Sequence, residues 1–344
     1  MFSSSREIFQ RTCAFFGIFN NSILALLILY RSPKKLGNYK FLMMYISIFE
    51  TLYSLLDFST IPEIFSKDYV FLIIIEKRLT VLPNFLLQCA LIIFGSLFGM
   101  SMAIFAIHFV YRYLVMTGSQ FIKTHHLLKV LGLIGFTLCM GVAWSFLHSS
   151  YHPIPQADIF LDVEYLKPRN LQLTEISYSG PCFQVQDEKG VLRMNWDVVG
   201  TTGVMILLIS LSFSTVFYCG ISIYKNIKSM TSMRSSLDQS LQSQLFYALV
   251  FQTLIPVILM HIPASFGFLV SIFGNSIQLF GQLPTFSIFL FPMLDPLPNF
   301  FIIRSYRQAI TEFFGCILST TSSHKTDSNH KLEMRPRAAA IVVN

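Results

Sequence analysis

"LTVLPNFLLQCALIIFGSLFGMSMAIFAIHFVY", residues 79–111, holds no Asp, Glu, Lys or Arg over 33 consecutive positions. A helix rises about 1.5 Å per residue, so about 20 apolar residues cross the hydrocarbon core of a bilayer. The run is therefore long enough to span a membrane as one helix. The first charge after it is Arg112, which lies between Tyr111 and Tyr113.

The composition extends this interpretation to the whole chain. Hydrophobic residues make up 53% of the 344 residues and charged residues only 12%, whereas soluble domains carry about 25% charged residues. A single water-soluble core cannot bury so large a share of apolar surface. The sequence therefore predicts an integral membrane protein that contacts the lipid bilayer.

Apolar segments separated by charged or Pro- and Gly-rich breaks give the expected helices. Seven of them are long enough to span a membrane, near residues 12–30, 40–61, 84–111, 128–147, 197–224, 244–272 and 279–303. Their residues do not alternate between polar and apolar, which excludes the strands of a membrane barrel. The predicted fold is all-α, a bundle of seven transmembrane helices.

The basic residues indicate the orientation of this bundle. With the N-terminus outside, 16 of the 25 Lys and Arg residues fall on the cytoplasmic side. Short cytoplasmic loops carry such an excess in membrane proteins. We therefore predict an outer N-terminus and a cytoplasmic C-terminus, and we attribute the net charge of +7 to topology. No loop combines Lys, Arg and aromatic residues densely enough to indicate a nucleic-acid partner.

The chain after the last span predicts a short amphipathic helix over residues 304–318. Apolar residues recur there at helical spacing, which is typical of a helix that lies on a membrane surface. Cys316 is a candidate for palmitoylation. Residues 1–318 are thus expected to form one membrane domain, and the polar residues 319–344 a disordered cytoplasmic tail.

Four stretches carry a resemblance to a known family. They are SPKKLGNYKFLMMYISIFETLYSLLD (32–57), HFVYRY (108–113), QLFYALVFQTLIP (244–256) and PMLDPLPNFFIIRSYRQAI (292–310). Together they resemble the nematode serpentine chemoreceptors of the Str class, a family of G-protein-coupled receptors that includes an olfactory receptor for diacetyl. The resemblance implies a receptor that binds a small odorant or soluble chemical and activates a heterotrimeric G protein. It also implies the plasma membrane of a chemosensory neuron's cilium as the location.

Tyr111, Arg112 and Tyr113 have two interpretations. Position alone fits a membrane anchor, because tyrosines and snorkelling arginines are common at helix ends. The resemblance instead implies that these residues take part in G-protein coupling. The chain departs here from rhodopsin-like receptors at large, since no acidic residue precedes Arg112 and no Asn-Pro-x-x-Tyr closes the last span.

Prolines and a buried acid are candidates for a conformational switch. Pro256 and Pro263 lie in the sixth span, and Pro292 and Pro296 flank Asp295 in the seventh. Each proline removes a backbone donor and kinks its helix. A carboxylate at such a depth costs at least about 2.5 kcal/mol and faces a partner or water. We expect a hinge, although prolines also occur in membrane helices for packing reasons.

Glu50 and Asp57 lie seven residues apart in the second span, hence on nearly the same helix face. Both are expected to point into the bundle. Glu50 is placed to pair with Asn20, Asn21 or Asp295. Asp57 has the alternative of lying solvated at the outer interface.

Cys89 and Cys182 are the candidates for a disulfide. Cys182 lies in an outer loop and Cys89 near the outer end of the third span, where an oxidising exterior permits a bridge. Cys89 would equally fit as a small residue in helix packing.

The candidate ligand contacts are polar residues in the outer halves of the spans. An apolar cavity with few polar groups suits a small, weakly polar ligand. The candidates are Ser96, Trp196, His261, Gln282 and Thr285.

No motif indicates an enzyme, a cofactor or a bound metal. His125-His126 lacks metal-ligand spacing, and no nucleophile elbow, zinc-protease motif or phosphate loop occurs in a suitable context. The alternative function is a transporter or a ligand-gated channel that acts without a G protein. Most transporters contain internal repeats, which seven dissimilar spans do not show, and a channel of the insect odorant-receptor kind would place its N-terminus inside.

Overall fold

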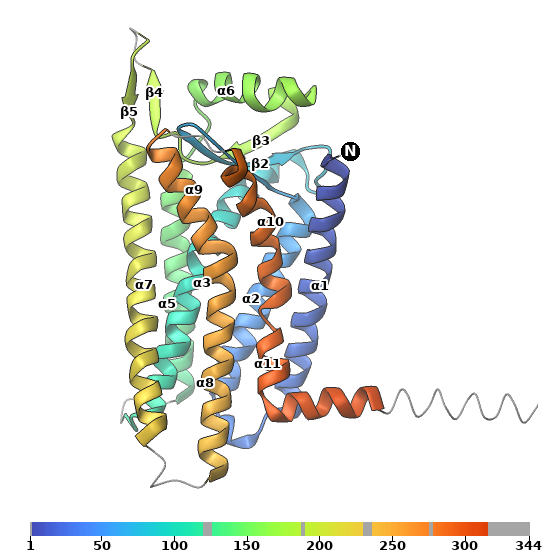
Figure 1. The fold of residues 1–344 in the computed structure, drawn as a ribbon, viewed down its shortest axis with the longest axis vertical. Helices are drawn as coiled ribbons and strands as arrows, with labels where there is room; N and C mark the ends of the chain where they lie inside the picture. The colour runs from blue at the N-terminus through green and yellow to red at the C-terminus, as the bar shows by residue number, and fades with distance from the viewer. Residues whose placement is uncertain (1, 120–125, 187–189, 230–235, 275–277, 316–344) are drawn as a thin grey trace, which may run out of the picture.

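The computed structural model describes residues 2–119, 126–186, 190–229, 236–274 and 278–315 (Figure 1). Within them, seven helices are long and apolar enough to cross a membrane, which confirms the predicted number of spans. Their bounds are α1 (Phe2–Arg31), α2 (Tyr39–Thr60), α3 (Leu87–Met116), α5 (His126–Ser149), α7 (Trp196–Ser229), then α8 (Ser236–Pro256) with α9 (Ile262–Ile272), and α10 (Gln278–Leu294) with α11 (Leu297–Ile302).

The first helix begins ten residues before the predicted span. Its first turns are polar, but Arg6 and Gln10 are buried against other segments, 7% and 1% exposed. Gln10 donates a hydrogen bond to the carbonyl of Pro62 at 3.1 Å. Tertiary contacts, not lipid, therefore stabilise the start of α1.

The sixth and seventh spans are interrupted at their prolines. Pro256 ends α8, a π-helical turn follows over Val257–His261, and Pro263 lies in the first turn of α9. Asp295 and Pro296 form the turn that separates α10 from α11. The predicted kinks are thus local breaks in helical hydrogen bonding.

The all-α prediction was incomplete, because five strands lie at the end of the bundle where the chain starts (Figure 1). β1 (Glu63–Lys67), β2 (Val70–Glu76) and β3 (Ile176–Ser179) form an antiparallel sheet in the order β1-β2-β3. β4 (Gln184–Gln186) and β5 (Leu192–Met194) form a separate hairpin. The segments that form all five strands were expected to be loops.

All seven residues of β2 are buried. Phe71, Ile73 and Ile75 point toward the helices and join their core. The alternate residues point the other way, into a second core that includes Leu161 of α6 (Pro155–Leu161) and Tyr165 of a π-helical turn, Asp162–Leu166. We call β1–β3 together with residues 155–166 the cap, and the bundle end beneath it the cap end. The cap therefore has two layers.

Hydrogen bonds attach the cap to the last two spans. The Ile64 N–H of β1 donates to Thr285 Oγ1 of α10, and the Thr285 hydroxyl donates to the Ile64 carbonyl, both at 3.0 Å. Ser271 of α9 donates to the Val70 carbonyl of β2 at 3.0 Å. The sheet is thus fixed to helices on two sides.

A buried ionic network joins α1 to the cap. Arg6 Nη1 lies 2.5 Å from Glu63 Oε2, and Arg6 Nη2 lies 3.3 Å from Glu76 Oε1. Tyr165 donates to Glu63 at 2.8 Å, and Arg169 pairs with Glu63 at 3.0 Å. Burial, together with the nearby Glu63 carboxylate, raises the pKa of Tyr165 far above its usual range. The Tyr165 side chain is therefore neutral, and its hydroxyl donates a hydrogen bond to the network.

At the opposite end, which we call the Arg112 end, residues 304–315 are helical and run away from the bundle (Figure 1). Tyr306 is buried, with its hydroxyl 2.7 Å from Ser32 Oγ. Phe313 and Phe314 are 64% and 59% exposed. This agrees with the predicted amphipathic helix as far as Gly315. Cys316 and the expected tail, 319–344, lie outside the described residues.

We predict that Arg6→Gln lowers the stability of the protein by about 3–5 kcal/mol, because it leaves the buried Glu76 carboxylate and the largely buried Glu63 carboxylate without their shared cation. Arg78→Gln is the matched control. Arg78 pairs with the same Glu76 at 2.8 Å, but its side chain is 52% exposed, so we expect a loss of at most about 1 kcal/mol. Thermal unfolding of the purified protein in lipid nanodiscs measures both, and equal losses would contradict the buried network.

Candidate functional site

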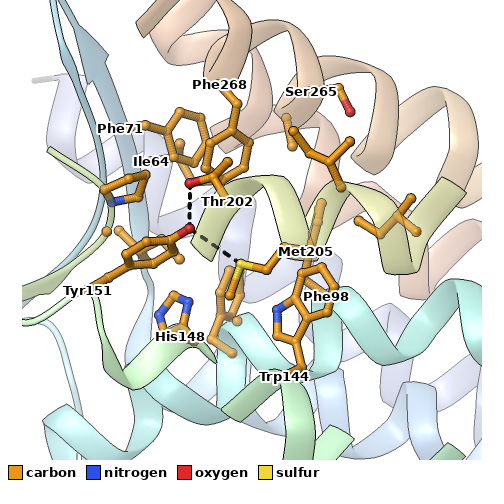
Figure 2. Close-up of a pocket in the computed structure, with 18 of the residues that line it drawn as sticks. Ile64, Phe71, Phe98, Trp144, His148, Tyr151, Thr202, Met205, Ser265 and Phe268 are labelled. Atoms are coloured by element: carbon orange, nitrogen blue, oxygen red, sulfur yellow. Dashed lines mark hydrogen bonds between the residues drawn. The ribbon is translucent and has the colours of Figure 1, made fainter. Parts of the chain in front are cut away.

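A cavity of about 300 Å³ lies beneath the cap (Figure 2). Aromatic and aliphatic side chains form most of its wall. The lining residues come from the cap and the loop before β4 (Ile64, Phe71, Ile73, Gly180, Pro181), from α3 (Phe94, Gly95, Phe98), from α5 and the loop after it (Trp144, His148, Tyr151), from α7 (Thr202, Met205, Ile206, Ile209), and from α9 and α10 (Ala264, Ser265, Phe268, Leu269, Ile272, Ile288).

Two polar side chains of this wall, those of Tyr151 and Thr202, lie side by side. The Tyr151 hydroxyl lies 2.6 Å from Thr202 Oγ1 and 3.4 Å from Met205 Sδ (Figure 2). The Thr202 hydroxyl donates a hydrogen bond to the Val198 carbonyl at 2.8 Å. Its single proton is thereby used, so Tyr151 is the donor in the hydrogen bond between the two hydroxyls. Burial raises the pKa of Tyr151 to about 12, so the hydroxyl stays neutral at physiological pH. The cavity therefore offers a ligand a neutral tyrosine hydroxyl, beside that of Thr202, in largely apolar surroundings.

Two glycines of α3 give the cavity its floor. A Cβ at Gly99 would lie 2.0 Å from the Trp144 ring, and one at Gly95 would lie 2.5 Å from His148 Nδ1. Only glycine lets these rings of α5 approach α3 so closely. His148 is held there by Ser179, whose Oγ lies 3.2 Å from His148 Nε2.

Four of the predicted ligand contacts do not line this cavity. Ser96 faces α5, with its Oγ 2.6 Å from Ser145 Oγ. Thr285 is hydrogen-bonded to the backbone of Ile64 in the cap. Trp196 lies at the first turn of α7 and is 74% exposed. His261 lies in the π-helical turn, 3.0 Å from Ser101 Oγ, with its ring against Phe98. The side chain of Gln282 lies outside the described residues.

The residues that the sequence analysis missed are His148, Tyr151, Thr202 and Met205. Tyr151 follows the last residue of α5 by two positions, and Thr202 is one of several hydroxyl residues in α7. No pattern in the sequence separates these from other polar residues near helix ends. Their common feature is tertiary, because the approach of α5 to α3 and of the cap to α7 brings them together.

The predicted bridge between Cys89 and Cys182 does not form, and both cysteines are free. Cys89 is exposed on α3, whereas Cys182 is buried in the core on the outer layer of the cap. The backbone of Cys182 pairs with Val70 of β2, and its thiol lies 3.2 Å from the Gln184 carbonyl. Burial raises the pKa of this thiol to about 11. The sheet already holds this loop without a disulfide.

At the Arg112 end, Arg112 lies inside the bundle and is 2% exposed. Its Nη2 donates to the Gln242 carbonyl of α8 at 3.1 Å, and its guanidinium carbon lies 5.3 Å from the centre of the Tyr39 ring. Tyr111 stacks on the same Tyr39, whereas Tyr113 packs against Tyr218 of α7. Arg112 therefore connects α2, α3 and α8. It lines a second cavity, of about 480 Å³, at this end.

A polar cluster lies between the two cavities. Asp295, at the break in the seventh span, accepts a hydrogen bond from Gln252 of α8 at 2.6 Å. Glu50 lies against Asp295 and is 0% exposed. Within the described part of the chain, neither Glu50 oxygen receives a donor hydrogen bond. Two adjacent buried carboxylates cannot both carry a full charge without a proton or a cation between them.

Helix α1 supplies the donors that the break needs. Pro296 has no N–H, which leaves the Pro292 carbonyl without its helical partner, and the turn at 295–296 interrupts the helical bonding of the next carbonyl, that of Met293. Asn21 donates to the Pro292 carbonyl at 3.0 Å, and Asn20 to the Met293 carbonyl at 2.9 Å. The asparagines, which were expected as partners of Glu50, donate instead to these carbonyls of the seventh span.

Asp57 is buried, 2% exposed, which excludes the solvated alternative. It faces Cys13 of α1 and Tyr53 of its own helix. Pro256, Pro263, Pro292 and Pro296 all lie at interrupted turns, and their role in a switch stays a prediction.

We predict that Asp295→Asn keeps or raises the thermal midpoint of unfolding, because the amide supplies a donor to Glu50 and removes one of two adjacent carboxyl groups. Asp295→Ala should lower it, because that change leaves the buried Gln252 amide without its acceptor and leaves a gap beside Glu50. Thermal unfolding of both variants in nanodiscs measures the difference. A fall with Asn as large as that with Ala would contradict a pairing of Glu50 with Asp295.

Comparisons with known proteins agree with this geometry. The family model described as "Serpentine type 7TM GPCR chemoreceptor Str" matches residues 6–311. "G-protein coupled receptor str-217" of Caenorhabditis elegans is 28% identical, covering 90% of this chain and 89% of that protein. "Serpentine receptor class r-10" of Caenorhabditis briggsae is 27% identical over 91% of each chain. Squid rhodopsin has a TM-score of 0.62 at 15% identity, covering 97% of this chain and 92% of its own, which shows a rhodopsin-like fold.

The resemblance noted in the four sequence stretches is thereby confirmed. The match covers every span, and the family consists of receptors, not enzymes. This chain belongs to the Str family of serpentine seven-transmembrane chemoreceptors and is a multi-pass membrane protein.

Proposed function

We propose that the receptor detects a small, weakly polar chemical in the cavity beneath the cap and passes the signal to a heterotrimeric G protein at the Arg112 end. The observation that carries the proposal is the cavity itself, apolar except for a few grouped polar side chains, of which Tyr151 and Thr202 form a hydrogen-bonded pair. Its volume, about 300 Å³, lies at the small end of ligand pockets, which run from about 300 to 1,000 Å³. Such a site suits an odorant-sized molecule.

The basic residues support an orientation with the cap end outside and the Arg112 end in the cytoplasm. Arg31, Lys34, Lys35 and Lys40 all lie near the Arg112 end, whereas Glu63 and Glu76 lie in the cap. The plasma membrane of a sensory cilium is the location that family membership supports. Residues 304–315 would then lie on the inner leaflet, where Phe313 and Phe314 insert between lipids.

Coupling between the two ends would run through the sixth span. Phe268 and Ala264 of α9 line the ligand cavity, and the π-helical turn at His261 separates them from α8. Because π-helical turns and prolines weaken local hydrogen bonding, this turn is a natural pivot. A ligand that displaces α9 would turn α8 about it.

Such a rotation would break two contacts made by α8. One is the hydrogen bond from Gln252 to Asp295, and the other is that from Arg112 to the Gln242 carbonyl. Loss of the second frees the guanidinium inside the 480 Å³ cavity. Arg112, with Tyr111 beside it, would then contact the α-subunit of the G protein.

We predict that Arg112→Ala abolishes the evoked response at unchanged surface expression, because no other buried cation lines the second cavity among the described residues. The test screens volatile and water-soluble compounds on cells that express the receptor with a promiscuous Gα subunit, with intracellular calcium as readout. Lys40→Ala removes an exposed charge at the same end and should leave the response intact. A response that persists both in Arg112→Ala and without any Gα would indicate a channel or transporter.

We predict that Tyr151→Phe weakens the potency of a responding compound that accepts a hydrogen bond, by up to about tenfold, the worth of one hydrogen bond. Thr202→Val should change potency in the same compounds, because it releases the Tyr151 hydroxyl from its partner. Thr215→Val removes a hydroxyl of the same helix that bonds only to Leu211, away from the cavity, and serves as control. Dose–response curves measure all three, and equal curves for the three variants would place the ligand elsewhere.

A further inference from the structure

We propose that ligands enter the cavity beneath the cap sideways from the lipid, through a mouth between α7 and α9, so that the receptor selects neutral molecules that dissolve in the membrane. This inference rests on the proposed function in taking that cavity as the ligand site. It adds a route and, with the route, a chemical class of ligand.

The route from water is closed by the cap. Phe71 and Ile73, which cover the cavity, are 4% and 8% exposed. Gly180 and Pro181 close the wall beside them and are also buried. Gly180 has φ +152°, and a Cβ there would lie 2.2 Å from the Phe71 carbonyl oxygen, so this loop lies directly on β2. Above β2 lies the second layer of the cap, built around Leu161 and Tyr165.

Among the described residues that line the cavity, the exposed ones all belong to two helices. Ile206 of α7 is 51% exposed, Leu269 of α9 is 52% exposed, and Ser265 of α9 is exposed as well. Every lining residue from the cap, from α5 and from α10 is buried. Figure 2 shows Met205 of α7 and Ser265 of α9 around the same space. The mouth of the cavity therefore lies between these two helices.

The surface around this mouth is apolar. Leu207 of α7 is 57% exposed, and Ile262 of α9 is 58% exposed. These residues belong to two of the spans long enough to cross a membrane, so the mouth faces hydrocarbon chains. A molecule that enters must leave water first, and a charge at that depth is costly. None of the described lining residues is Asp, Glu, Lys or Arg, so the cavity wall offers no opposite charge to stabilise a charged ligand.

The test measures access to a cysteine placed in the wall. Met205→Cys is introduced in the full-length receptor in lipid vesicles, which are then exposed to neutral methyl methanethiosulfonate or to its anionic sulfonatoethyl analogue. Peptide-resolved mass spectrometry measures the labelling of the introduced cysteine separately from that of the native cysteines. Leu192→Cys, 47% exposed in the β4–β5 hairpin, gives the reference ratio in water. Ser265→Cys, a nearly isosteric change at the mouth, replaces Met205→Cys if that variant does not fold.

We expect the ratio of neutral to anionic labelling to be at least about tenfold higher in the cavity than at Leu192→Cys, because the anion must cross hydrocarbon. Ile206→Trp should slow neutral labelling several-fold by filling the mouth. Leu211→Trp, on the exposed face of the same helix but away from the cavity, should not. Anionic labelling at the reference ratio, or no effect of Ile206→Trp, would overturn lateral entry. Labelling requires neither ligand nor G protein, so this result is independent of whether the receptor signals.

Discussion

β2 carries apolar side chains on both faces, and a strand of this kind is stable only between two apolar layers. The helix bundle supplies one layer, and α6 with the following π-helical turn supplies the other. Because β2 must lie flat on the bundle, Phe71 and Ile73 cover the space between α3, α5, α7 and α9. The shape of the cavity, its closure toward the cap and its opening between α7 and α9 all follow from this one requirement.

Buried polar groups connect this cavity to the Arg112 end. A polar group in a membrane protein must find its partner inside the chain. The carbonyls of Pro292 and Met293, at the break in the seventh span, accept hydrogen bonds from the asparagines of α1, and Gln252 is bonded to Asp295. Arg112 has a carbonyl of α8 as its partner. The asparagine bonds join α1 to α10, the Gln252 bond joins α8 to the break in the seventh span, and the Arg112 bond joins α3 to α8. A movement of α8 therefore changes the last two bonds at once.

Hydropathy was sufficient to predict the seven spans, because a lipid environment requires long apolar helices whatever their neighbours. Proline positions likewise predicted where the last two spans break. β2 could not be predicted in this way. Its run, "VFLIII" (70–75), is too short for a span, and two-sided burial removes the alternation that identifies a strand. The segment was therefore expected to be an outer loop.

The site was less predictable than the fold, since it depends on which helices approach one another. In the sequence, Gly95 and Gly99 look like ordinary residues of an apolar helix. In the structure, their lack of a side chain lets the rings of His148 and Trp144 pack against α3 at the cavity floor. Trp196 and Thr285 have suitable chemistry, but one faces outward and the other is bonded to the cap. Arg112 is buried inside the bundle, which distinguishes it from an anchor at the membrane surface, and its part in coupling stays a prediction.

The most direct measurement is a cryo-electron microscopy structure of the receptor with an activating compound and a G protein. We predict that the compound lies beneath Phe71 with a polar atom near Tyr151 or Thr202, and that the inner part of α8 has moved away so that Arg112 no longer bonds to Gln242. A compound bound elsewhere, with the contact between Arg112 and Gln242 intact in the activated receptor, would contradict both the site and the coupling.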